Sequence, residues 1–178
     1  MIFIILVIAS GLDFGLCLWV GPKVYSRSHN DTVPGRRIIV PGRQRTVQED
    51  GEINEWMWYN VATAKIRFSV WRYRTFDQTS KKHSLQLVAQ TEEFETISKV
   101  DIAKLEVEEG KRLAVKKGDI LGLEYLDNNP VSYEHTGQTC NSENMLMSLS
   151  LDASRVISET EIEEFLVEAT NPCRTYGF

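Results

Sequence analysis

The stretch AKIRFSV at residues 64–70 alternates apolar with polar residues, and it decides the fold class. A period of two predicts a β-strand whose even-numbered side chains are buried and whose odd-numbered side chains face water. Four further segments repeat the alternation and are predicted to be strands: residues 85–89, 103–107, 121–125 and 145–151. Short strands without intervening amphipathic helices indicate an all-β fold.

Residues 53–61 are apolar on both parities, with Trp56 and Trp58 on one side and Met57 and Tyr59 on the other. Such a pattern predicts a central strand that is covered on both faces. We therefore expect Trp58→Ala to damage folding more than Trp71→Ala. Between two later apolar strands, residues 116–118 (KKG) predict a hairpin in which glycine takes the left-handed position.

Near the C-terminus two patterns compete. Ser158 followed by Glu161 forms a capping box, whereas Phe165, Val167 and Ala169 alternate as in a strand. We expect a short helical piece over 158–163 followed by a strand to residue 169. The complete prediction is a single-domain, antiparallel, jelly-roll-like β-sandwich.

The first seventeen residues are largely apolar, and Gly15 and Cys17 occupy the small positions before a predicted cleavage site. A later cleavage site, with Val24 and Ser26 at its two small positions, and an uncleaved anchor are the alternatives. A spanning helix needs about 20 apolar residues, and Asp13 near its centre costs about 2.5 to 3.5 kcal/mol. We therefore expect a signal peptide at 1–17, a secreted protein and no membrane span after cleavage.

The remaining chain is predicted to comprise a basic N-terminal arm at 18–39 and the β-sandwich domain at 40–178. The arm is rich in arginine, whereas glutamates crowd the C-terminal segment, and the formal net charge is −5. This asymmetry fits an anionic partner, or a solvated arm near an acidic surface.

Removing Cys17 leaves the even pair Cys140 and Cys173, which predicts one disulfide in an oxidising compartment. Two unpaired thiols in a reducing compartment are the alternative. Asn30 opens the sequon Asn-Asp-Thr and is the predicted glycosylation site.

Several short elements recur at a characteristic spacing: Gly51-Glu52-Ile53, Trp56, Trp58-Tyr59, Val70-Trp71-Arg72, Leu85, Leu87-Val88, Val115, Gly118-Asp119 and Leu121-Gly122. Over roughly residues 40–169, this pattern resembles a module of secreted and membrane-bound ectodomains of marine invertebrates. The resemblance implies a jelly-roll-like extracellular β-sandwich. It implies no catalytic or ligand residues.

Catalytic and metal signatures are weak. His29, His83 and His135 lie in turn-like or polar contexts without a nucleophile elbow, so we expect no enzyme and no cofactor. The carboxylate pairs Asp119 with Glu124 and Glu92 with Glu93 are interpreted as solvated. The best metal candidate is a Ca²⁺ loop with oxygen donors from Asp127, Asn128, Asn129 and Glu134, and an ordinary turn is the favoured alternative.

The candidate ligand surface is the outer face of the strand from residue 64 to residue 73. Trp71 and Tyr73 share the parity of Arg67 there, and Arg72 and Arg74 bracket the two rings. Exposed rings beside arginines bind sugars, anionic groups or protein partners. The favoured alternative is that a loop, the basic arm or a neighbouring strand covers both rings.

Two functions remain. The first is a secreted interaction or structural module of an extracellular coat, matrix or body fluid, with a protein or glycan partner and no nucleic acid. The second is a carbohydrate-binding protein that uses the aromatic and arginine face, with or without Ca²⁺.

Overall fold

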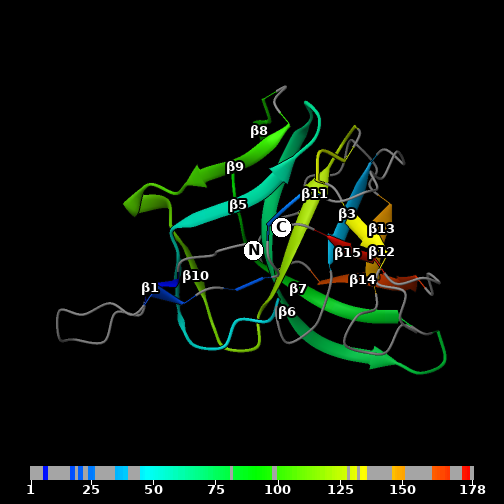
Figure 1. Ribbon diagram of the computed structural model, residues 1–178. Helices are drawn as coiled ribbons and strands as arrows, with labels where there is room; N and C mark the ends of the chain where they lie inside the picture. Colours follow the sequence, from blue (N-terminus) through cyan, green and yellow to red (C-terminus); the bar gives the residue numbers. More distant parts are fainter. Residues whose placement is uncertain are drawn as a thin grey trace.

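The computed structural model describes residues 6–7, 17–18, 20–21, 24–26, 35–39, 45–80, 82–97, 100–127, 129–131, 133–135, 146–150, 162–168 and 174–176 (Figure 1). In these ranges the chain is all-β with antiparallel pairing, and its one helical element is the 3-10 turn η1 (Glu109–Lys111). The predicted all-β, antiparallel class is confirmed. The jelly-roll-like sandwich stays a prediction.

The strands have the following bounds: β1 Leu6–Val7, β2 Cys17–Leu18, β3 Arg36–Ile39, β4 Gly51–Ile53, β5 Glu55–Asn60, β6 Lys65–Asp77, β7 Lys82–Gln90, β8 Phe94–Glu95, β9 Asp101–Glu106, β10 Leu113–Val115, β11 Ile120–Tyr125, β12 Tyr133–His135, β13 Leu146–Ser150, β14 Ile162–Glu168 and β15 Arg174–Tyr176. All five strands predicted from alternation are present.

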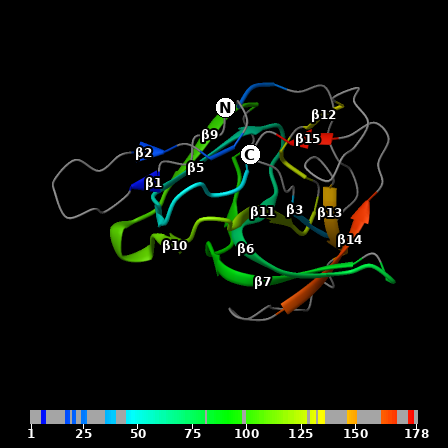
Figure 2. The same ribbon diagram turned by 90° about the horizontal axis from the view of Figure 1, so that it is seen from below.

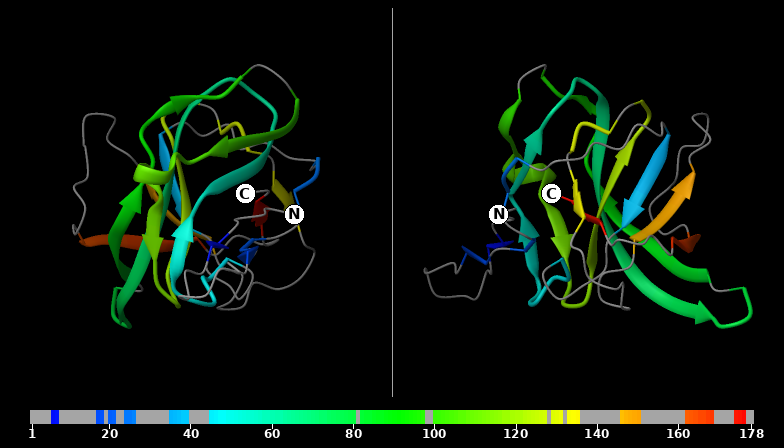
Figure 3. Two further views of the ribbon diagram at one scale, coloured as in Figure 1. Left: turned by 90° about the vertical axis from the view of Figure 1, so that its left-hand side faces the viewer. Right: turned by 45° about the vertical axis from the view of Figure 1, so that its right-hand side comes forward.

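Six strands close on themselves by antiparallel pairing. Their order is β6, β11, β3, β13, β14 and β7, and β7 pairs back to β6. Figure 3 shows the strong curvature of β6 and β7, which are two strands of this closed sheet. The strands β5, β9 and β10 lie on the side of β6 and β11 that faces away from β13 and β14 (Figure 2). The closed sheet therefore has an inner face, and its outer face can pack against a second layer.

The main core lies between the outer face of β6 and the layer that contains β4 and β5. Ile66, Phe68 and Val70 are fully buried, which confirms the predicted apolar face of this strand. Trp56 of β5 stacks on Phe68 with ring centroids 4.6 Å apart and planes 6° apart. Aromatic stacking of this kind adds to the area that each ring removes from water.

The predicted central strand is only partly correct. Most of β5 is buried on both parities, including Trp56, Met57 and Trp58, as the apolar pattern predicts. Among the described residues, however, β5 forms a ladder only with β9. Its buried residues of both parities belong to the main core, so burial does not place β5 at the centre of a sheet.

The predicted hairpin at 116–118 is wrong, because β10 pairs with β4 while β11 pairs with β3 and β6. The turn instead carries the chain from one layer to the other. Gly118 has φ +93°, as predicted for the left-handed position. The Asp119 carboxylate accepts a hydrogen bond from the Lys116 N–H at 2.8 Å and thereby stabilises this crossing.

The predicted boundary between a basic arm and the domain is also wrong. Residues 36–39 form β3, a strand of the closed sheet between β11 and β13. Arg37, Ile38 and Ile39 are buried, as are Val20 and Val24 further upstream. The arm therefore contributes to both cores, because its apolar residues and one arginine have partners inside the fold.

The C-terminal prediction of a strand ending at residue 169 is confirmed in substance by β14 (Ile162–Glu168). Its register places Phe165 opposite His83 of β7. The proposed helical piece falls mostly on residues 158–161, which lie outside the described part, and residues 162 and 163 belong to the strand.

Gly122 of β11 is a position where the close approach of two strands requires glycine. A Cβ there would lie 2.8 Å from Ser69 Oγ and 2.9 Å from Trp71 Nε1. We expect Gly122→Ala to lower the free energy of unfolding by about 1 to 3 kcal/mol, the usual cost of overpacking. The matched control is Gly110→Ala, whose added methyl meets nothing within 4 Å. Urea denaturation tests the pair, and equal midpoints would contradict the crowding at Gly122.

Candidate functional site

The structure removes Trp71 from the predicted ligand surface. Its ring is fully buried on the inner face of the closed sheet, together with Ile39, Leu85, Leu87 and Ile120. The Arg37 guanidinium lies 5.2 Å from the ring centroid. The favoured alternative of a covered ring is thus confirmed for Trp71, and the cover includes a residue of the supposed basic arm.

Arg67 and Arg72 both form ion pairs with carboxylates. Arg72 donates two hydrogen bonds of 2.8 Å to Asp119, which raise its pKa above the ordinary value. Arg67 contacts Glu124 at 3.0 Å and Glu93 at 3.3 Å. Paired guanidinium groups have few donors left for a ligand, so both arginines primarily hold strands together.

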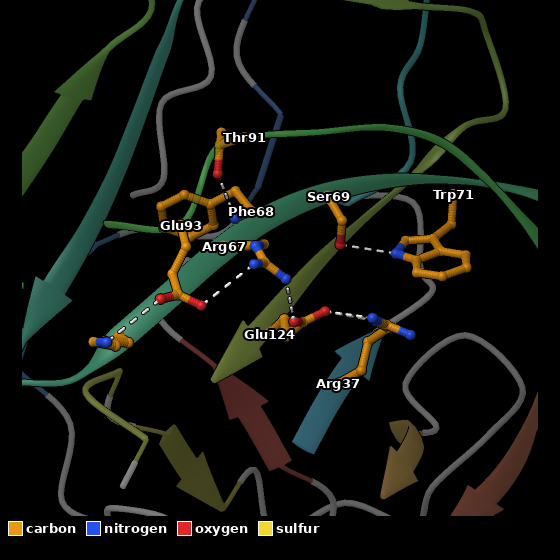
Figure 4. A network of polar contacts seen from close by, with 9 residues as sticks. Arg37, Arg67, Phe68, Ser69, Trp71, Thr91, Glu93 and Glu124 are labelled. Atoms are coloured by element: carbon orange, nitrogen blue, oxygen red, sulfur yellow. Dashed lines mark hydrogen bonds and ion pairs between the residues drawn. The ribbon is translucent and has the colours of Figure 1, made fainter. Parts of the chain in front are cut away.

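The Arg67 contacts belong to a network that crosses the closed sheet (Figure 4). Glu124 of β11 accepts hydrogen bonds from Arg67 of β6 and from buried Arg37 of β3. Glu93 extends the network to the exposed Lys65 at 3.7 Å. The two buried charges, Arg37 and Glu124, face each other in the interior, where an unpaired charge is costly. The network is therefore structural, and the interpretation of Glu124 as a solvated acid is wrong.

The same correction applies to Asp119, which is buried and bound to Arg72. Glu92, in contrast, is exposed, and its partner Lys111 lies 3.9 Å away.

Tyr73 is the one member of the predicted surface whose ring reaches solvent. It is 43% exposed, and Phe76 on the same strand is 40% exposed. Two β-bulges, at Val70/Trp71 and Tyr73/Thr75, shift the register of β6 against β7. The second bulge places Phe76 and its partner His83 on the same face as Tyr73. We name Tyr73, Phe76 and His83 the hairpin aromatic surface.

His83 joins the two exposed rings. Its ring centroid lies 4.5 Å from that of Phe76 and 5.8 Å from that of Tyr73. Partial burial lowers the pKa of His83 below its ordinary value, and its Nδ1 is buried without a hydrogen-bond partner. The folded protein therefore favours the neutral imidazole.

This environment predicts a pH dependence of stability. As the pH falls below about 6.5, the ordinary pKa of histidine, His83 becomes protonated in the unfolded chain while it stays neutral in the folded protein. The free energy of unfolding must then decrease, since the unfolded state binds more protons. We expect His83→Phe, which keeps a stacking ring, to lose part of this decrease. Urea midpoints at about pH 7.5 and about pH 5.5 measure it, and an unchanged decrease in the variant would contradict the account.

A separate concavity lies between the end of β7 and the segment from β9 to β10. This open groove has a volume of about 660 Å³ and is lined by residues 88–94, 105–108 and 110–114. Its apolar residues are partly buried against the main core: Val88, Phe94, Leu105, Val107 and Leu113. A concave site with an apolar floor and a few polar groups is typical of a ligand site.

Charged side chains surround the apolar floor of the groove. Glu92 and Glu108 are 86% and 78% exposed at the side chain, and Lys111 lies between them at 3.9 and 3.6 Å. Arg112 is half-buried, and its Nε has no hydrogen-bond partner. Among the described residues, no carboxylate lies within ion-pairing distance of Arg112. The groove can thus bind a ligand that combines apolar groups, cations and hydrogen-bond acceptors.

The predicted Ca²⁺ loop receives no support from Asn129. Its Oδ1 accepts a hydrogen bond from the Val131 N–H at 2.9 Å and so holds a turn. Asp127 is exposed, and the side chains of Asn128 and Glu134 lie outside the described part. Over the residues that the structure describes, no cluster of three or more histidine, cysteine or acidic side chains could hold a metal.

Other predictions fall outside the described residues. Asn30, Cys140 and Cys173 are among them, so glycosylation and the disulfide stay predictions. The signal peptide also stays a prediction, although Leu6–Val7 and Cys17–Leu18 pair as β1 and β2. In the described part of the chain, no helix has the length and apolar character needed to cross a bilayer.

The groove was not predicted from the sequence. Its lining combines residues of β7 and β8, which share one sheet, with residues of β9 and β10, which belong to two other sheets. The one local signal is the high density of exposed acids at residues 92–95 and 106–109, which is ambiguous alone.

Comparison with known proteins adds no relatives: no protein-family model, curated protein or solved structure matches this chain. The resemblance to ectodomain modules of marine invertebrates therefore stays a prediction.

Proposed function

We propose that this chain is a secreted, non-catalytic interaction module that binds an extracellular partner protein through the groove. The observation that carries the proposal is the open concavity of about 660 Å³ with an apolar floor. Interfaces of this kind combine a desolvated apolar centre with a polar rim. The signal peptide at 1–17, glycosylation at Asn30 and the disulfide between Cys140 and Cys173 belong to the same proposal, since all three require the secretory route.

The positions of the buried charged side chains support a binding role over a catalytic one. Arg37, Asp119 and Glu124 are buried. Arg37 of β3 pairs with Glu124 of β11, and Asp119, in the turn before β11, pairs with Arg72 of β6. These groups hold the closed sheet together and are not directed at the groove. The proposed module uses its titratable core residues for stability and its groove for recognition.

Carbohydrate binding is the second candidate, and the exposed rings of Tyr73 and Phe76 favour it. Here the hairpin aromatic surface replaces the predicted set Arg67, Trp71, Arg72 and Tyr73, of which only Tyr73 is retained. Both rings lie on β6 of the β6–β7 hairpin and reach solvent although β7 also pairs with β14, so a glycan could reach them.

The two candidates predict opposite effects of surface substitutions. Fluorescently labelled full-length protein is applied to an array of extracellular ectodomains and to a glycan array, the latter with and without Ca²⁺. The groove is blocked by Ala114→Phe, at an exposed lining residue, and Thr75→Phe is the matched control on exposed β6. Tyr73→Ser with Phe76→Ser removes the hairpin rings.

We expect Ala114→Phe to weaken ectodomain binding at least about tenfold, or 1.4 kcal/mol. We expect Thr75→Phe and the variant without the hairpin rings to leave ectodomain binding unchanged. Ectodomain binding that Ala114→Phe leaves unchanged would overturn the proposal. Glycan binding that disappears only in the variant lacking Tyr73 and Phe76 would establish the second candidate instead.

A further inference from the structure

We propose that the groove binds an extended segment of the partner protein, in which basic and apolar residues alternate, and that the segment adds to an unpaired strand edge. This inference rests on the proposed function, because it specifies the occupant of the same groove. Four features of the groove carry it: strand edges, apolar floor, acidic rim and the unpaired Arg112.

Two strands that line the groove have an unpaired main-chain edge among the described residues. β10 is the end strand of its sheet, and β9 forms a ladder only with β5. An edge strand presents N–H and C=O groups in a regular row, which is a template for another extended chain. Peptides that bind in this way gain affinity from main-chain hydrogen bonds and specificity from alternate side chains.

The apolar floor selects one set of those side chains. Phe94, Leu105 and Leu113 approach the groove from three different strands and are each partly exposed. In an extended peptide, every second side chain points to the same face. A segment with an apolar residue at every second position would therefore cover the floor.

The rim selects the other set. Glu92, Glu106 and Glu108 are exposed along the groove, whereas Lys111 is the one exposed cation among its lining residues. The contacts of Lys111 with Glu92 and Glu108 are long and exposed, and such pairs contribute little. Lysine or arginine side chains of a partner can therefore replace Lys111 beside these carboxylates at small cost. Charge complementarity of this kind favours a basic segment over an acidic one.

Arg112 completes the argument. Its guanidinium is half-buried with an unpartnered Nε and no described carboxylate within reach. Buried N–H groups in native proteins nearly always have an acceptor. A main-chain carbonyl of the bound segment supplies one without bringing a negative charge towards the acidic rim.

The test uses the full-length protein and a nonapeptide of alternating lysine and valine, capped at both ends, at a salt concentration of about 0.15 M. Glutamate replaces lysine in a second peptide. A third keeps the lysines but carries N-methyl groups on alternate peptide bonds. The protein variants are Glu92→Arg with Glu106→Arg in the groove, and Glu95→Arg with Glu109→Arg as a control of equal charge change. The control positions are exposed and do not line the groove.

We expect the lysine peptide to bind at least tenfold tighter than the glutamate peptide in isothermal titration calorimetry. The groove variant should lose at least tenfold in affinity, and the control variant less than threefold. Equal losses in both variants would show nonspecific attraction and overturn the inference. Undiminished binding of the N-methylated peptide would overturn strand addition.

The array experiment separates this inference from the proposed function. If Ala114→Phe abolishes binding of an ectodomain while the lysine peptide does not bind, the groove is the site but its occupant is not a basic extended segment. If the peptide fails and Ala114→Phe leaves ectodomain binding unchanged, both proposals fail.

Discussion

Trp71→Ala is expected to lower the free energy of unfolding by about 3 to 5 kcal/mol, the usual loss when a large buried aromatic is truncated. The ring is completely buried, its Nε1 donates to Ser69 Oγ at 2.8 Å, and Arg37 lies over it. Truncation therefore leaves a cavity and also removes the partner of a buried hydroxyl. Guanidinium denaturation of purified wild type and variant gives the difference.

The matched control is Tyr73→Ala, two residues along the same strand and 43% exposed. Its loss should be well under half of that for Trp71→Ala. A Trp71→Ala loss of less than about 1 kcal/mol, the range of ordinary surface changes, would show that the inner face is not a packed core. The expected ranking of Trp58 above Trp71 is withdrawn, because both rings are buried and both donate to neighbouring side chains.

Glu124→Ala is expected to cost about 3 to 5 kcal/mol, because it leaves the buried guanidinium of Arg37 without its counterion. Arg67 loses the same carboxylate but retains Glu93 at 3.3 Å. The loss should therefore come mainly from Arg37. Thermal and chemical denaturation at neutral pH measure it.

A double variant separates the charge effect from packing. Arg37→Met with Glu124→Leu removes both charges, and exchanges of this kind are often neutral or stabilising. We expect the double variant to be more stable than Glu124→Ala, with strong non-additivity in the double-mutant cycle. A double variant as unstable as the sum of its single variants would contradict the ion pair as the cause.

The outer core was predictable because its signal is local. Alternation over 64–70 correctly predicts a strand with Ile66, Phe68 and Val70 inside. The other face of the same strand was misjudged, because alternation marks Ser69 and Trp71 as members of a polar row. In a closed sheet that row also faces an interior, and pairing over long sequence distances compensates its charges.

Arg37 illustrates the distant pairing most clearly. It stands beside Arg36 in a basic segment that reads as a solvated arm, yet its carboxylate partner is Glu124, 87 residues later. No local pattern connects these two residues. The candidate site has the same character, since residues 88–94, 105–108 and 110–114 form one groove only after four strands are in place.

Tyr73 shows the reverse case, in which a predicted site residue is exposed but its predicted neighbours are not. The bulge at Tyr73/Thr75 in β6 brings Phe76 and His83 to it instead. A bulge is an insertion in the pairing of two strands, so the sequence of one strand does not reveal it.

Hydrogen exchange of the full-length protein, alone and saturated with the ectodomain that it binds, tests the central claim most directly. The account predicts slower amide exchange at residues 88–94, 105–108 and 110–114, which line the groove, and unchanged exchange at residues 73–83 of the hairpin. Protection confined to 73–83, with the groove segments unaffected, would contradict the groove as the binding surface.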